Sequence, residues 1–247
     1  MKNVNVKRMV GIALLIALIV VLQAIGGMIP PIGGFSISLV LIPIVLGAAM
    51  YGPGAGALLG AAFGIIVYIN CVTGADPGGA MVFQANPVLC FIVVLAKGIL
   101  AGFVSGVVYK LLKKVNLYIA IVCAAVICPV VNTGVFITCM FLFFIDVLGS
   151  WAGGGDLVGY VLTGLVLANF VPELIINVIL SPVSQRVINI INKGSTYMSS
   201  KAGLDAEIAS VITGLILLFS ACGAYIRYLV KKNKDKLEEA NKAKEVA

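Results

Sequence analysis

Two charged side chains lie inside long apolar segments of this sequence, where a charge could bind a ligand. Lys97 stands within the apolar segment 88–109, thirteen residues before Lys110, which is about 20 Å along a helix. Its ammonium is therefore too deep to reach that end easily. Glu173 stands within the apolar segment 158–180. Because a charge at such depth is costly, we expect Lys97 to contact an anionic ligand or to pair with Glu173, and we favour the ligand.

Polar residues recur around Glu173 at helical spacing. Asn169 and Asn177 lie four residues before and after it, so all three share one stripe of a helix. An acid in a membrane span normally faces a cavity or a partner. We therefore predict that Asn169 and Glu173 contact a ligand, while a purely structural role for Glu173 is equally compatible with the pattern.

A proline with two polar neighbours interrupts the apolar segment 117–144. Pro129 has no backbone N–H, so a carbonyl near Ala125 loses its helical hydrogen bond. Asn132 and Thr133 follow, where water is scarce. These two side chains either repair the kink or bind the ligand, and we predict binding.

Two glycine-rich segments are candidates for covers over such a site. Segment 72–87 contains a single acid and mobile glycines, as expected of a lid, although an ordinary connector fits slightly better. Segment 146–157 contains Trp151, the only tryptophan, which we predict to be a stacking residue or an interfacial anchor.

Catalytic and metal-binding patterns are missing from the sequence. It contains no histidine, and its six cysteines form no C-x-x-C pair. Residues 153–156 match the G-x-G-D of intramembrane aspartyl proteases, but Asp156 falls in a loop and no second aspartate lies deep in a span. We therefore expect neither an enzyme nor a metal or other cofactor.

The composition indicates an all-α polytopic membrane protein. Hydrophobic residues make up 61% of the chain and charged residues 11%, which excludes a soluble domain with a charged shell. Apolar runs of about 20 residues favour helices over barrel strands. The net charge of +7 does not call for nucleic acid, because the basic residues flank apolar runs in the lipid bilayer.

Six spans form the predicted core, residues 1–193. Lys2, Lys7 and Arg8 precede the first span and place the N-terminus in the cytoplasm of a multi-pass plasma-membrane protein. The predicted spans are 9–29, 35–50, 54–71, 88–109, 117–144 and 158–180.

The sequence after this core departs from a six-span pattern. We predict a polar linker at 194–207, an additional apolar helix at 208–230 and a charged tail at 231–247. The additional helix spans the membrane, lies at its surface or re-enters it. A seventh span would put the basic tail outside, against the charge rule.

Small residues recur at four-residue spacing on two helices. Gly56, Gly60 and Gly64 predict a close helix pair. The close spacing of Gly52, Gly54 and Gly56 could also suggest a nucleotide-binding loop, but no βαβ pattern surrounds these glycines, and we favour helix packing. Ala13 and Ala17 form a second small face, which packs within the protein or docks on another membrane subunit.

These features resemble one family. Ala13 and Ala17, the block L-I-P-I-V-L-G-A-A-M-Y-G-P-G-A-G-A-L-L-G at 41–60 and K-G-I-L-A-G at 97–102 are similar to the substrate-binding (S) components of energy-coupling factor (ECF) transporters. The resemblance covers about 9–193 and is most specific at 41–60. It implies a six-helix bundle that binds a water-soluble vitamin from outside. It also implies docking, through Ala13 and Ala17, on a membrane coupling subunit with two cytoplasmic ATPases.

The resemblance also suggests where the vitamin binds. Family pockets form from the outer loops and spans four to six, which here contain Lys97, Asn132, Thr133, Trp151, Asn169 and Glu173. The N-T-G-V-F stretch at 132–136 is most similar to pantothenate-type members, with folate and riboflavin as other possibilities. The alternative is an autonomous secondary transporter or channel for a small polar solute, although no internal repeat of broken helices supports it.

Overall fold

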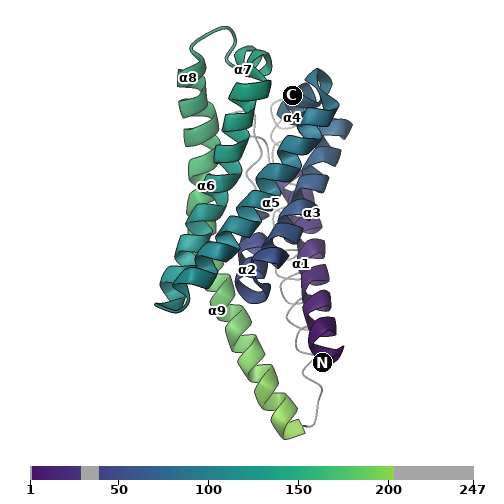
Figure 1. Cartoon of the computed structure of the whole chain (residues 1–247), viewed down its shortest axis with the longest axis vertical. Coiled ribbons are helices and arrows are strands. Elements are labelled where there is room, and N and C mark those ends of the chain that lie inside the picture. The colour runs from purple at the N-terminus through teal and green to yellow at the C-terminus, as the bar shows by residue number, and fades with distance from the viewer. Residues whose placement is uncertain (1, 29–38, 203–247) are drawn as a thin grey trace, which may run out of the picture.

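The described part of the chain is a helical bundle (Figure 1). The computed structural model describes residues 2–28 and 39–202, and every regular element in these ranges is helical. The elements are α1 (Lys2–Met28), α2 (Leu41–Tyr51), α3 (Pro53–Thr73), α4 (Pro77–Ala85), α5 (Pro87–Leu112), α6 (Leu117–Phe143), α7 (Ile145–Trp151), α8 (Leu157–Tyr160), the π-helix η1 (Val161–Phe170) and α9 (Val171–Ala202).

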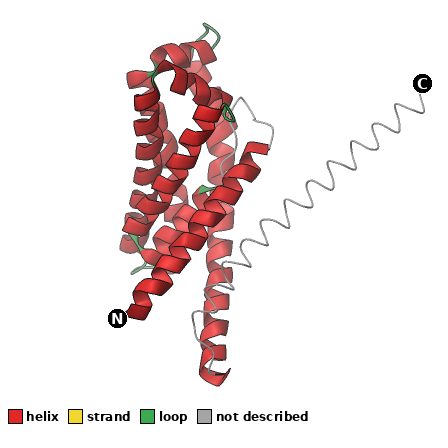
Figure 2. Cartoon of the chain, turned by 90° about the vertical axis from the view of Figure 1, so that its right-hand side faces the viewer, coloured by secondary structure: helices red, strands yellow, loops and turns green. Residues whose placement is uncertain are grey.

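The prediction of an all-α polytopic membrane protein is confirmed. Within the described residues, five segments are long and apolar enough to cross a membrane: Arg8–Gly26, Pro53–Thr73, Pro87–Leu112, Leu117–Phe143 and Leu157–Arg186. They lie side by side in both views (Figures 1 and 2). These segments correspond to predicted spans one and three to six.

The predicted second span is shorter than the others in its described part. Helix α2 has 11 residues, or about 16 Å, and the predicted span begins in residues that the structure does not describe. Its apolar side chains are enclosed, with Leu41, Ile44 and Val45 fully buried, and it contacts α1, α3, α5, α6 and α9. A helix that is apolar on all sides is most stable when surrounded by protein, so α2 fills the bundle core.

The glycine face of α3 forms a close helix pair, as predicted, and its partner is α5. A Cβ added at Gly60 would overlap the backbone carbonyl of Gly98, and one added at Gly56 would overlap that of Gly102. The relation is reciprocal, because a Cβ at Gly98 would meet the Gly60 carbonyl. These glycines let the two backbones touch and thereby fix the position of α5, which contains Lys97.

Helix α6 passes through Pro129 without a break. The carbonyl oxygen of Ala125, which the proline leaves free, accepts a 2.7 Å hydrogen bond from Asn177 Nδ2 of α9. Ser181 Oγ donates to Asn177 Oδ1 at 3.0 Å. The prediction of a freed carbonyl is therefore confirmed. The repair comes from Asn177, so Asn132 and Thr133 remain available for another role.

Three segments predicted as irregular contain helices. Segment 72–87 includes α4, segment 146–157 includes α7, and the described part of the predicted linker 194–207 continues α9 to Ala202. Both α4 and α7 are short and hold one fully enclosed apolar residue each, Val82 and Leu148, so packing overrides their glycine content. The predicted helix 208–230 and tail 231–247 lie outside the described residues.

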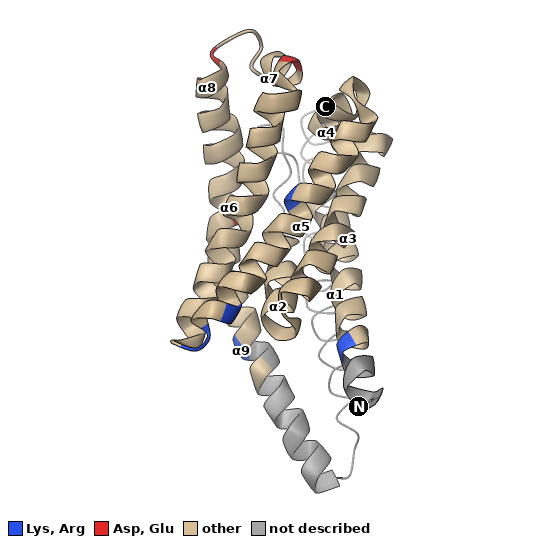
Figure 3. Cartoon of the chain, in the orientation of Figure 1, with Lys and Arg blue, Asp and Glu red and all other residues tan. Residues whose placement is uncertain are grey.

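The two ends of the bundle differ in charge (Figure 3). Lysine and arginine gather at one end of the bundle, here called the basic end. Arg8 of α1 and Lys110 of α5 line one groove there. The acidic residues near α7 and α8 lie at the opposite end. Lys97 stands between the two ends, along α5.

Candidate functional site

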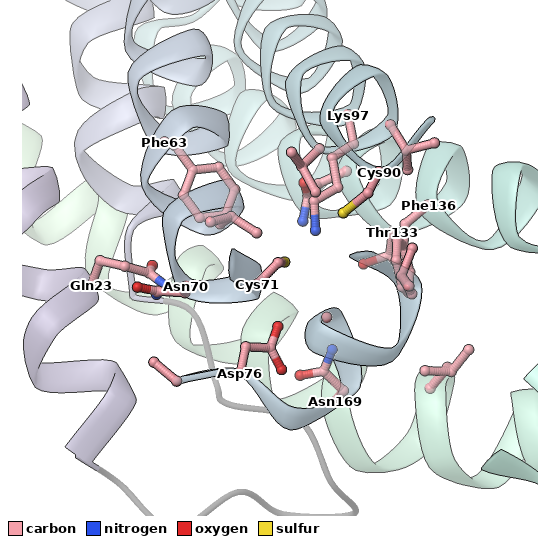
Figure 4. A pocket seen from close by; sticks show the side chains of 18 of the residues that line it. Gln23, Phe63, Asn70, Cys71, Asp76, Cys90, Lys97, Thr133, Phe136 and Asn169 are labelled. Carbon is pink, nitrogen blue, oxygen red and sulfur yellow. The ribbon is translucent and has the colours of Figure 1, made fainter. Parts of the chain in front are cut away.

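One pocket in the described structure brings together all six predicted ligand-binding residues (Figure 4). It lies toward the end that carries α4 and α7, and α1, α3, α5, α6, η1 and α9 also contribute to its lining. The predicted residues that line it are Lys97, Asn132, Thr133, Trp151, Asn169 and Glu173. The helices of the bundle thus converge on one polar site.

Lys97 is the cation of this pocket. Its Nζ lies 4.8 Å from the ring centroid of Phe136 and 6.0 Å from that of Phe63. The ammonium therefore rests against the negative faces of aromatic rings. Among the described residues it forms no ion pair, so the alternative of a Lys97–Glu173 salt bridge is not realised. An ammonium held in this way has its N–H donors available to an anion.

Three acceptor oxygens of the pocket have no hydrogen-bond partner. Glu173 is 3% exposed and Asn132 6% exposed. Glu173 Oε1, Asn132 Oδ1 and Asn169 Oδ1 are buried without a donor among the described residues. Buried polar atoms are normally paired, so a group of unpaired ones that converge on one pocket marks a candidate binding site.

The mouth of the pocket is closed in part by α4 and α7. Trp151 Nε1 of α7 donates to Met81 Sδ of α4 at 3.2 Å, which links the two short helices. Phe83 of α4 packs edge-to-face on Tyr68 of α3, with the ring centroids 5.8 Å apart. The two glycine-rich segments are thus held over the pocket by specific contacts, in the place expected of a lid.

The π-helix η1 supplies two lining residues, Leu165 and Asn169. A π turn widens the helix by one residue per hydrogen-bonded turn, and such turns occur often at functional sites. Glu173, which also lines the pocket, lies in the first turn of α9, the helix that directly follows η1. Sequence patterns gave no signal for this π-helix, because apolar periodicity does not distinguish α from π turns over so few residues.

Sequence reasoning missed several polar residues that line the pocket. Gln23 comes from α1, Asn70 from α3 and Asp76 from the turn before α4. Cys71 and Cys90 also face it, and Figure 4 shows their sulfur atoms directed into the same space as Asp76. For Asn70 and Cys71 the sequence offered one signal, because they recur with Phe63 and Val67 at the spacing of one face of α3.

Asp156 has a local structural role. Its Oδ1 accepts from Val158 N and its Oδ2 from Gly159 N, both at 3.0 Å, so it caps the N-terminus of α8. The residue is exposed. Its match to a protease motif therefore reflects helix capping.

The alanine pair of α1 lies away from this pocket. Ala13 is exposed and Ala17 half-buried, while Leu15, Leu18 and Ile19 of the same helix are enclosed in the core. The enclosed face of α1 thus does not include the alanine pair.

Comparison with known proteins agrees with this architecture. Residues 7–185 match the model of the family described as ECF transporter, substrate-specific component. No curated protein and no solved structure matched the chain. The matched segment covers more than half of the sequence and contains every residue that lines the pocket. The chain is therefore a member of the substrate-specific components of ECF transporters, the substrate-binding membrane subunits of these importers.

Proposed function

We propose that this protein captures a water-soluble vitamin, with pantothenate favoured, in the pocket around Lys97. The observation that carries the proposal is that six residues chosen from the sequence as ligand contacts line one pocket. A free ammonium suits a carboxylate, and Asn132 and Thr133 can bond hydroxyl or amide groups. Folate also carries carboxylates, and riboflavin would use the aromatic rings, so both remain alternatives.

The vitamin enters from outside the cell in this proposal. Basic residues concentrate at the end opposite to α4 and α7, and the positive-inside rule puts such an end in the cytoplasm. The N-terminus, at the basic end, is then cytoplasmic, and the pocket opens to the exterior of the plasma membrane.

Transport itself depends on a coupling module. The loaded protein docks on a membrane coupling subunit that carries two ATPases, and Ala13 and Ala17 form the contact. The exposure of Ala13 supports this assignment, because a small exposed side chain lets a partner helix approach the backbone.

Uptake of labelled pantothenate tests the function. Cells that lack their own uptake route should accumulate pantothenate only when this protein and a compatible ECF module are produced together. Equal uptake without the module would contradict the proposal and favour an autonomous transporter.

Replacing both Ala13 and Ala17 with leucine should reduce this uptake to background while pantothenate affinity stays within about threefold of wild type. The leucines hold the partner helix away from α1, which weakens docking, and neither position lines the pocket. Val130→Phe is a suitable control, because it adds bulk to an exposed residue of α6. Loss of binding in the double variant would show that the alanines pack within the protein.

A further inference from the structure

The three unpaired acceptors of the pocket come from three neighbouring elements. Asn169 and Glu173 lie one helical turn apart in η1 and α9, and Asn132 comes from α6. Contacts between α6 and both η1 and α9 bring these elements together. Their free oxygens, Asn132 Oδ1, Asn169 Oδ1 and Glu173 Oε1, are here called the acceptor wall.

No donor among the described residues pairs with these three oxygens. The Lys97 ammonium, which also lines the pocket, lies over the rings of Phe63 and Phe136. Asn177, the next polar residue of the Glu173 stripe, uses its amide N–H on the Ala125 carbonyl. Leaving a buried acceptor unpaired costs free energy, and a carboxylate oxygen costs more than an amide oxygen. The donors must therefore arrive with whatever fills the pocket.

We propose that the acceptor wall selects substrates by their hydrogen-bond donors: the bound molecule turns a face rich in O–H or N–H groups to Glu173, Asn169 and Asn132, and its anionic group to Lys97. This assignment rests on the proposed function and adds a substrate class to it. The pocket recognises a molecule with separated anionic and donor-rich ends. A molecule that offers only acceptors at this end would leave the three oxygens unpaired and bind weakly.

Pantothenate has this distribution of groups. Its carboxylate lies at one end, and its hydroxyl groups and amide N–H follow along the rest of the chain. Its alcohol form, panthenol, keeps the donors and lacks the carboxylate. Derivatives with methylated hydroxyls keep the carboxylate and lose donors. Panthenol therefore tests the contact of the carboxylate, and the methylated derivatives test the contacts of the hydroxyl groups.

The chain provides a matched control for a buried unpaired acceptor. Gln185 is on the same helix as Glu173, is 8% exposed, and its Oε1 also lacks a partner. It does not line the pocket. A change at Gln185 therefore alters a buried polar group of α9 without touching the acceptor wall.

The experiment measures pantothenate affinity and melting temperature in detergent for wild type, Glu173→Leu, Glu173→Gln and Gln185→Leu. We expect Glu173→Leu to weaken pantothenate binding about tenfold or more and Gln185→Leu to leave it unchanged. Without ligand, Glu173→Leu should keep or raise the melting temperature, because an unpaired buried acceptor is replaced by an apolar group. Glu173→Gln, which retains one acceptor, should fall between leucine and wild type.

Comparing pantothenate and its derivatives in wild type and in Glu173→Leu tests whether Glu173 contacts the donor groups of the ligand. The methylated derivative should bind wild type more weakly than pantothenate does, and this difference should shrink in Glu173→Leu, because the acceptor is already absent. Panthenol should lose affinity equally in wild type and in Glu173→Leu, since its missing group faces Lys97. Unchanged pantothenate affinity in Glu173→Leu, or a lower melting temperature without ligand in both Glu173 variants, would overturn the acceptor wall. Failure of the wild-type protein to bind pantothenate or any other vitamin would instead overturn the proposed function.

Discussion

Gly60→Ala should lower the melting temperature of the detergent-solubilised protein by about 2–12 °C, from a loss of about 1–3 kcal/mol in the free energy of unfolding. The added methyl would overlap the backbone carbonyl of Gly98. A backbone cannot rotate away as a side chain can, so α3 and α5 would have to separate. Because α5 holds Lys97, we also expect weaker vitamin binding.

Gly134→Ala is the matched control for this change. Gly134 lies in α6, and a Cβ added there would meet no atom within 4 Å. Alanine is the better helix former, so this variant should be as stable as wild type or slightly more stable. Equal melting temperatures for Gly60→Ala and Gly134→Ala would show that α3 and α5 are not in backbone contact.

Lys97→Met should weaken vitamin binding by about 1.5–3 kcal/mol, which is roughly one to two decades in affinity. The ammonium is the cation that lines the pocket, and methionine keeps the apolar contact with Phe63 and Phe136 while removing the charge. Without ligand, the stability of the protein should change little, because Lys97 forms no ion pair with another described residue that the substitution could break. Titration calorimetry and thermal unfolding measure the two effects.

A double variant separates the ligand role of Lys97 from a structural one. If Lys97 and Glu173 stabilised each other, Lys97→Met alone would cost several kcal/mol and the addition of Glu173→Gln would restore stability. We expect neither a stability loss of several kcal/mol in Lys97→Met nor a restoration of stability by Glu173→Gln. Lys110→Met, at the basic end of the same helix, should leave affinity unchanged. Restored stability with unaltered affinity in the double variant would contradict the ligand contact.

The sequence predicted the long helices well because lipid imposes a simple rule on them. A spanning segment must be apolar for about 20 residues and must pair its own backbone groups, so α3, α5 and α6 follow directly from apolar runs. The glycines at 56, 60 and 64 predicted which face of α3 packs closely against another helix, since only small residues allow backbone contact. Pro129 predicted a free carbonyl because proline has no N–H to donate.

Other features depend on tertiary contacts that no local pattern contains. The partner of the Ala125 carbonyl, Asn177, lies 52 residues away. Helices α4 and α7 form where the glycine content favours loops, and are held by the Trp151–Met81 contact and the Phe83–Tyr68 pair. Five of the six predicted ligand residues were recognisable because a polar group in an apolar helix is rare, and Trp151 because it is the only tryptophan in the sequence. Asp76 and Asn70 lie near helix ends, where polar residues are common, and were therefore missed.

Calorimetric titration of the purified wild-type protein with pantothenate, and with folate and riboflavin in parallel, tests the central claim most directly. We expect one vitamin to bind with one molecule per chain and a dissociation constant below the micromolar range, and pantothenate to be that vitamin. In the same titration, the dissociation constant for Lys97→Met should be about ten- to a hundredfold higher than that for wild type. If none of the vitamins binds at micromolar concentration, the pocket is not a vitamin site and the proposed function is wrong.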